Sequence, residues 1–125
     1  MKSWNSTEFW AEYSNFKVGP ESGKYKISFS SSYSKSHSTI GNSMSVANGQ
    51  LFSARDANND ECSNRNFNCA AHYNGWWFSC CSNIFPNGQF FNYPTALSAP
   101  DWKGIVWRYG FGPAYSLMEI EILIA

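Results

Sequence analysis

The residues best suited to chemistry lie between positions 56 and 81. Asp56, Asn58 and Asp60 place side-chain oxygens at alternate positions, and a loop rich in Asn and Ser follows them. Calcium takes about six to eight oxygen ligands from carboxylates, amides and backbone carbonyls. The four cysteines of the chain fall in the same stretch: Cys62, Cys69, Cys80 and Cys81. The stretch therefore predicts a small ligand or cation site on a loop that cysteine chemistry holds in place.

The cysteines favour disulfides over a metal site. Their spacing contains no Cys-x-x-Cys pair, and adjacent Cys80 and Cys81 are poorly placed to act as two tetrahedral zinc ligands. Four cysteines allow about three pairings, so the spacing alone leaves the connectivity open, including a Cys80–Cys81 bond or free thiols. Two disulfides and a composition low in charge are typical of a secreted domain.

Composition excludes several classes of protein. The 125 residues fit a single domain, 1–125, and nine basic residues balance nine acidic ones without forming blocks. This pattern argues against a nucleic-acid binder and against a polybasic membrane surface. No apolar run reaches the length of a membrane span. The segment after Met1 lacks the apolar core of a signal peptide, so we expect a secreted chain that is truncated at its N-terminal side.

Short extended segments separated by turns account for most of the chain. Segment 24–30 alternates apolar and polar residues and should pair with 12–19 as an antiparallel hairpin. Segment 30–38 is rich in Ser and predicts a loop, and segment 92–103, with two prolines, predicts another. We expect single helical turns at 40–44 and 69–73, and tight turns at Asn48-Gly49 and Asn87-Gly88. We expect strands at 76–78, 104–107 and 118–124.

Several short motifs recur in a definite order along the chain. They include Asn68-Cys69-Ala70, the Trp76-Trp77 pair, Gly104-Ile105-x-Trp107 and the final Met118-Glu119-Ile120. In this order the motifs resemble the fibrinogen C-terminal domain family, which includes fibrinogen chains, ficolins, tachylectins, angiopoietins and tenascins. The resemblance implies an α+β, loop-rich fold of antiparallel strands with short helical turns, of which this chain carries only the later part.

The resemblance also implies a calcium site and a disulfide. The family's calcium ligands match the side chains of Asn58 and Asp60 and the backbone carbonyls of Cys62 and Asn64. Asn58 stands where the family has a carboxylate, which removes one negative charge and should weaken binding of Ca2+. Cys69 and Cys81 match the family's disulfide pair. Cys62 and Cys80 are left over, and a second bridge between them would run parallel to the first.

Lectin members of the family hold an acetyl group beside the second cysteine of the family's disulfide pair, which corresponds to Cys81. By resemblance, the backbone N–H groups of Cys80 and Cys81 would bind its carbonyl, and Tyr73 would form part of an aromatic wall. Ser82 replaces the histidine of that wall. Tyr93 and Tyr109 are candidates for the remaining wall residues, whereas core packing is an equally good reading of Tyr73.

The sequence therefore predicts a non-catalytic recognition module rather than an enzyme. The leading hypothesis is a secreted, calcium-assisted lectin of the innate-defence type that binds acetylated carbohydrates or similar surface groups. The alternative is an angiopoietin- or tenascin-like module that binds a protein receptor or the extracellular matrix, with a degenerate sugar pocket. Oligomerisation would depend on sequence upstream of this chain.

Overall fold

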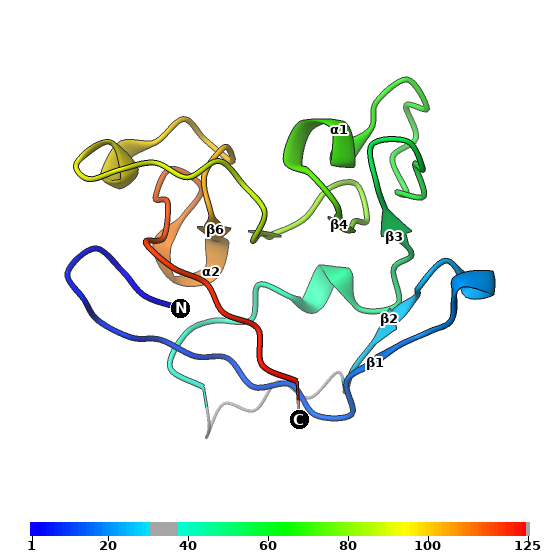
Figure 1. The fold of residues 1–125 in the computed structure, drawn as a ribbon, viewed down its shortest axis with the longest axis horizontal. Helices are drawn as coiled ribbons and strands as arrows, with labels where there is room; N and C mark the ends of the chain where they lie inside the picture. The colour runs from blue at the N-terminus through cyan, green and yellow to red at the C-terminus, as the bar shows by residue number, and fades with distance from the viewer. Residues whose placement is uncertain (31–37, 125) are drawn as a thin grey trace.

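Three two-stranded antiparallel pairs, joined by long loops, make up the regular part of the fold. The computed structural model describes residues 1–30 and 38–124, so most of the predicted 30–38 loop lies outside the described residues. Strands β1 (Lys17–Val18) and β2 (Ile27–Ser28) form the first pair. β3 (Phe52–Ser53) pairs with β4 (Trp76–Trp77), and β5 (Ile84–Phe85) pairs with β6 (Val106–Trp107). The α+β, loop-rich, antiparallel character predicted from the sequence is confirmed (Figure 1).

The predicted hairpin forms around β1 and β2, but its strands are shorter than the alternating pattern suggests. Ile27 is fully buried and Phe29 nearly so, as the alternation requires. Tyr25 instead has a positive φ of 52° and is 44% exposed, so it belongs to the turn. The 3-10 turn η1 (Glu21–Gly23) closes the hairpin.

Short helical turns stand close to their predicted places. Helix α1 (Cys69–Tyr73) begins where expected, because the Asn68 side chain accepts the Ala71 N–H and caps it. The turn predicted for 40–44 forms instead as η2 at Ser45–Ala47. Two further short elements lie where none was predicted: η3 (Thr95–Ser98) and α2 (Arg108–Phe111), whose path is kinked at Tyr109 and Gly110.

A single core joins these elements. Phe78, Ile84, Val106 and Leu117 are fully or almost fully buried, and Trp76 and Trp107 are buried beside them. Phe78 follows β4, Ile84 lies in β5, and Val106 and Trp107 lie in β6, so the core joins the β3–β4 pair to the β5–β6 pair. Each buried aromatic ring removes about 150–250 Å² of surface from water, so an aromatic core can stabilise a fold whose strands are short.

The clearest strand of the sequence pattern does not form. Met118 donates its N–H to Lys2 O, and Lys2 donates its own to Glu119 O, which makes one isolated bridge. Residues 120–124 make no backbone hydrogen bond with other described residues, and Ile122, Leu123 and Ile124 are 54%, 83% and 69% exposed. Alternation alone does not make a strand, because the strand also needs a neighbouring backbone to complete its hydrogen bonds.

Two loops approach each other most closely at Gly88 and Gly104. A Cβ added at Gly88 would stand 1.9 Å from the carbonyl oxygen of Gly104. The next residue, Gln89, donates its N–H to Lys103 O at 2.8 Å and joins the same loops. The predicted Asn87-Gly88 turn therefore brings segment 87–89 against 103–104.

Replacing Gly88 with Ala should destabilise the protein by about 1–3 kcal/mol, because the added methyl group forces two backbones apart. Urea unfolding of the wild type and variant measures this loss. Gly23→Ala is the matched control, since a Cβ there meets nothing within 4 Å. An equal midpoint for Gly88→Ala and the control would contradict the close approach of the loops.

Candidate functional site

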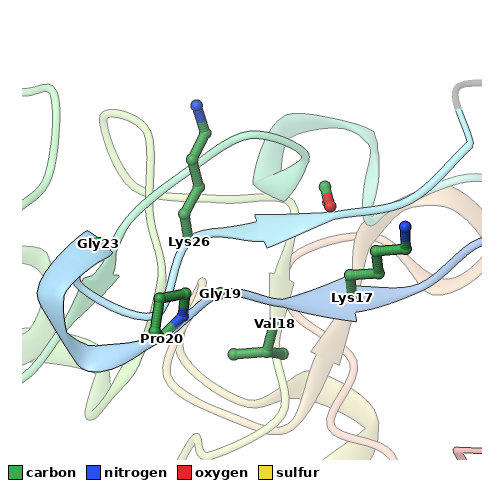
Figure 2. Close-up of a pocket in the computed structure, with 7 residues that line it drawn as sticks. Lys17, Val18, Gly19, Pro20, Gly23 and Lys26 are labelled. Carbon is green, nitrogen blue, oxygen red and sulfur yellow. The ribbon is translucent and has the colours of Figure 1, made fainter.

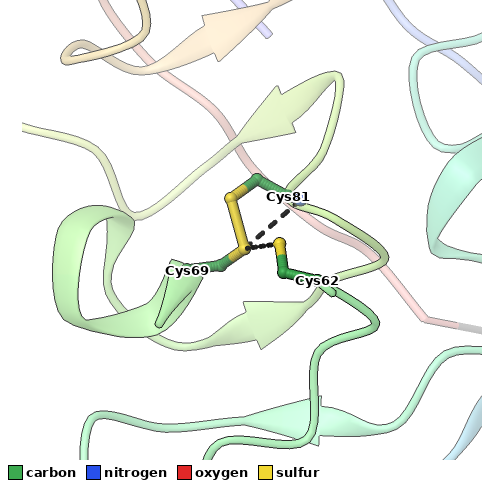
Figure 3. Close-up of side chains that lie close together, drawn as sticks. All are labelled: Cys62, Cys69 and Cys81. Carbon is green, nitrogen blue, oxygen red and sulfur yellow. Dashed lines mark hydrogen bonds between the residues drawn. A yellow bond between two sulfur atoms is a disulfide. The ribbon is translucent and has the colours of Figure 1, made fainter. Parts of the chain in front are cut away.

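Two disulfides fasten the central loop to the segment after β4. Cys62 is bonded to Cys80, and Cys69 to Cys81, so the pairing implied by the family resemblance and the predicted second bridge both form. Figure 3 shows three of these cysteines, with the Sγ atoms of Cys62 and Cys69 3.7 Å apart. The Cys81 N–H also donates to Cys69 Sγ at 3.2 Å. The two adjacent cysteines of the sequence thus serve two bridges that lie in contact.

Asp60 is the buried acid of this arrangement. Its side chain is only 3% exposed, and its two carboxylate oxygens accept the N–H groups of Cys62 at 3.1 Å and Cys69 at 2.9 Å. One carboxylate therefore binds both cysteines at the start of the two disulfides. Hydrogen bonds to an ionised acceptor are stronger than neutral ones, at about 1.5–3 kcal/mol each.

The other predicted calcium ligands also make contacts within the loop. Asn58 Oδ1 accepts the Asp60 N–H, Asn58 Nδ2 donates to Phe67 O, and the Asn64 carbonyl accepts the Phe67 N–H. Arg65 donates to the Asp60 carbonyl at 3.0 Å and brings a positive charge into the loop. Within residues 1–30 and 38–124, the only group of three metal-ligating side chains is made of disulfide cysteines. A carboxylate has about four lone-pair positions, so Asp60 keeps some capacity for a cation.

Three residues of the predicted acetyl pocket, Cys81, Tyr73 and Ser82, make contacts within the protein. The Cys81 N–H is directed to Cys69 Sγ, as described above. Tyr73 is half-buried and packs on Phe85 with ring centroids 4.3 Å apart. Ser82 accepts the Ile84 N–H through its hydroxyl at 3.3 Å.

The three predicted tyrosines do not form one wall. Tyr93 is 63% exposed and its ring neighbour is Trp4, at 6.2 Å. Tyr109 is 46% exposed and lies beside Arg108. Among the described residues, no ring contact joins Tyr73, Tyr93 and Tyr109 to one another. The lectin assignment of these residues remains a prediction.

A different cluster includes two of the three tyrosines. The Phe85 ring, which packs on Tyr73, also meets Trp102 at 5.8 Å. The Arg108 guanidinium lies 5.6 Å from the Trp102 ring and 5.5 Å from the Tyr109 ring, and Lys103 Nζ lies 5.6 Å from the Tyr73 ring. We name this set the aromatic–cation strip; it consists of Tyr73, Trp102, Lys103, Arg108 and Tyr109.

The scaffold fixes the centre of the strip. Arg108 donates from Nη1 to Asn83 Oδ1 at 2.9 Å and from its backbone N–H to Asn83 O at 3.0 Å. Asn83 is buried and lies two residues after Cys81, so the disulfide segment positions the guanidinium. Neither Arg108 nor Lys103 makes an ion pair with another described residue, which leaves both charges available to a partner.

Sequence reasoning missed Trp102, Lys103 and Arg108. No spacing rule joins positions 73, 102 and 108, and the contacts of Lys103 with Tyr73 and of Arg108 with Trp102 depend on the tertiary fold. The one signal was compositional: two Trp, a Lys, an Arg and a Tyr occur within residues 102–109, in a chain of low charge.

A cavity of about 530 Å³ lies elsewhere, on the β1–β2 hairpin. Figure 2 shows that Lys17 and Lys26 extend to one side of the hairpin and Val18 to the other. The lining contains no acid and no aromatic ring. It brings together none of the residues that the sequence or the disulfides single out.

Comparison with known proteins gives the family. A family model described as the fibrinogen beta and gamma chains, C-terminal globular domain, matches residues 1–125. The chain belongs to this family. Bovine angiopoietin-4 is 35% identical over 125 residues, covering 99% of this chain and 24% of its own length, and human angiopoietin-1 is 32% identical over 127 residues with the same coverage.

Solved structures of the fibrinogen-like domain agree with this fold. The fibrinogen-like globe domain of human ANGPTL2 matches with a TM-score of 0.80 and 30% identity, covering 94% of this chain and 51% of that one. Lamprey fibrin D-dimer in complex with a Gly-His-Arg-Pro-amide peptide matches with a TM-score of 0.78 and 28% identity, covering 94% and 40%. The chain therefore spans about half of a solved fibrinogen-like domain and about a quarter of the angiopoietins. Among the helices of the described residues, none has the length and apolar character needed to cross a membrane.

Replacing Asp60 with Ala should lower the free energy of unfolding by about 1.5–3 kcal/mol or more, since two buried N–H groups lose an ionised acceptor. Asp56→Ala removes an exposed carboxylate from the same loop and should change stability by less than about 0.5 kcal/mol. Chemical denaturation under oxidising conditions separates the two. Equal stability of the variants would show that the Asp60 carboxylate does not hold the loop.

Proposed function

We propose that this chain is part of an extracellular, non-catalytic module that recognises another protein. The observation that carries the proposal is the aromatic–cation strip, where two unpaired cations lie against aromatic rings on a surface fixed by disulfides. Tyr, Trp and Arg are the residue types that dominate the energetics of protein interfaces. Two disulfides in one loop support an oxidising, extracellular location, and the angiopoietin relatives support the same reading.

The strip favours a partner with acidic groups. Arg108 offers further guanidinium donors beyond the one bound to Asn83, and planar donor pairs suit carboxylates. Lys103 adds a second positive charge, while Asp101 is the one acid next to these residues in sequence. Lamprey fibrin, which shares this fold, is found in complex with a Gly-His-Arg-Pro-amide peptide. That peptide is basic, so the acidic class proposed for this chain rests on Arg108 and Lys103 alone. We assign an acidic protein segment as the ligand class for this chain.

Substitution of Arg108 with Gln should weaken binding to the partner about tenfold or more, as expected when an interface arginine is lost. The measurement is surface plasmon resonance against a panel of purified cell-surface ectodomains, with an N-acetylglucosamine resin as a separate arm. Lys17→Gln is the control, because it removes one exposed charge from the distant hairpin.

Two outcomes would overturn the assignment. Saturable binding that Arg108→Gln and Lys17→Gln leave equally strong would exclude the strip as the contact surface. Retention on the sugar resin without binding to any ectodomain would support the lectin prediction instead.

We further propose that the loop at Asn58 and Asp60 binds calcium weakly. One carboxylate is present where the family has two, and Arg65 adds a positive charge, so a lower affinity than that of a two-acid site follows. When bound, the ion would fix the loop before α1. Its ligands would be the side chains of Asn58 and Asp60 and the carbonyls of Cys62 and Asn64.

Asn58→Asp should enlarge the calcium-induced rise in melting temperature, because it restores a second carboxylate. Without calcium the same change should destabilise the loop, since a carboxylate would face the Phe67 carbonyl in place of the amide. Thermal unfolding in millimolar calcium and in EDTA measures both effects, with Asn66→Asp as a control of equal charge. No calcium dependence in the wild type or in Asn58→Asp would exclude the site.

A further inference from the structure

One motif of the sequence takes no part in the proposed function. Asn5-Ser6-Thr7 has the form of an N-glycosylation acceptor, and no other Asn-x-Ser or Asn-x-Thr triplet occurs in the chain. Such triplets arise often by chance. The structure therefore has to show whether this one is presented to solvent and what lies around it.

The triplet forms the tip of an exposed turn. Ser6 donates its N–H to Ser3 O, and Ser3 donates its own to Thr7 O, both at 3.0 Å. Ser6 has a positive φ of 64°, and residues 5–8 are exposed. The turn is closed through the backbone, so it does not depend on the Thr7 side chain.

The oxygen and the nitrogen of the Asn5 side-chain amide differ in their hydrogen bonding. Its Oδ1 accepts hydrogen bonds from Ser3 Oγ at 2.5 Å and from the Thr7 N–H at 3.1 Å. Nδ2, the atom that takes a sugar, makes no hydrogen bond with any described residue. A glycan on Nδ2 would therefore break none of the contacts that shape the turn.

An exposed aromatic surface begins at the preceding residue. Trp4 is anchored by two hydrogen bonds, from its N–H to Tyr115 Oη and from Nε1 to Ser116 O, each at 2.9 Å. Its ring lies 6.1 Å from Phe90 and 6.2 Å from Tyr93. Phe90 and Tyr93 are 54% and 63% exposed. We name these three residues the Trp4 patch.

We propose that Asn5 carries an N-linked glycan and that this glycan covers the Trp4 patch. Contiguous exposed aromatic surface promotes association, and a bulky, solubilising glycan on the adjacent residue would screen it. The aromatic–cation strip shares no residue with the Trp4 patch. The inference rests on the extracellular location proposed above.

The modification is a simple group transfer. An oligosaccharide linked to a lipid diphosphate supplies the sugar, and a bond forms between its anomeric carbon and Asn5 Nδ2. The bond from that carbon to the diphosphate oxygen breaks, Nδ2 loses one proton, and nothing is oxidised or reduced. The secretory pathway of the host cell provides both the donor and the transferase.

The test is to secrete the chain from mammalian cells with a heterologous signal peptide fused to its N-terminus. The signal peptide directs the chain into the secretory pathway, whatever its natural location. Wild type and Thr7→Ser should carry a glycan that peptide N-glycosidase removes, and Thr7→Ala should not. Intact mass and peptide mapping read out occupancy at Asn5. Thr7→Ala is preferred to a change at Asn5, because the Thr7 hydroxyl makes no hydrogen bond with a described residue.

Screening of the patch is tested on the same material. Enzymatic removal of the glycan should increase binding of an apolar dye such as ANS, and Phe90→Ser with Tyr93→Ser should abolish the increase. A secreted, folded wild type without a glycan would overturn the site. A glycan whose removal leaves dye binding unchanged would overturn its covering role. Neither result bears on partner binding at the strip, which the Arg108→Gln experiment tests separately.

Discussion

The carboxylate of Asp60 is the interaction on which the middle of this protein depends. It accepts the backbone N–H groups of Cys62 and Cys69, the first cysteine of each disulfide. The Glu61 N–H, bonded to Ser79 O, joins the same loop to the segment that carries Cys80 and Cys81. A buried charge is tolerated only when it is paired or hydrogen-bonded. The disulfides and the carboxylate therefore depend on one another, because each holds the backbone that the other needs.

That fastening explains how strands of only two residues can present a defined surface. β5 begins three residues after Cys81, and it pairs with β6, which leads directly into Arg108. Buried Asn83, two residues after Cys81, holds Arg108 through two hydrogen bonds, so the disulfide segment positions the centre of the aromatic–cation strip. In this chain the disulfide segment supports a charged aromatic surface, and Tyr73 packs on Phe85 beside it.

The protein has two aromatic surfaces that differ in charge: the aromatic–cation strip and the Trp4 patch. The strip carries two cations that form no ion pair with another described residue, and we propose an acidic partner for it. The Trp4 patch carries no charge among its three residues. The proposed glycan at Asn5 would screen the second of these surfaces. The exposed tail at Ile122, Leu123 and Ile124 is a third apolar surface. It belongs to the segment 118–124 that the sequence pattern predicted as a strand.

Local patterns in the sequence were enough to predict the hairpin, the helical turn at 69–73, the Asn87-Gly88 turn and the family. These depend on neighbouring residues or on motifs at fixed spacing. Tertiary structure alone decided whether Met118–Ile124 became a strand, because a strand requires a partner backbone. It also directed the Asp60 carboxylate to the Cys69 N–H and brought the Arg108 guanidinium to the Trp102 ring. Such contacts join residues with no fixed spacing along the chain, so pattern reasoning had no period from which to predict them.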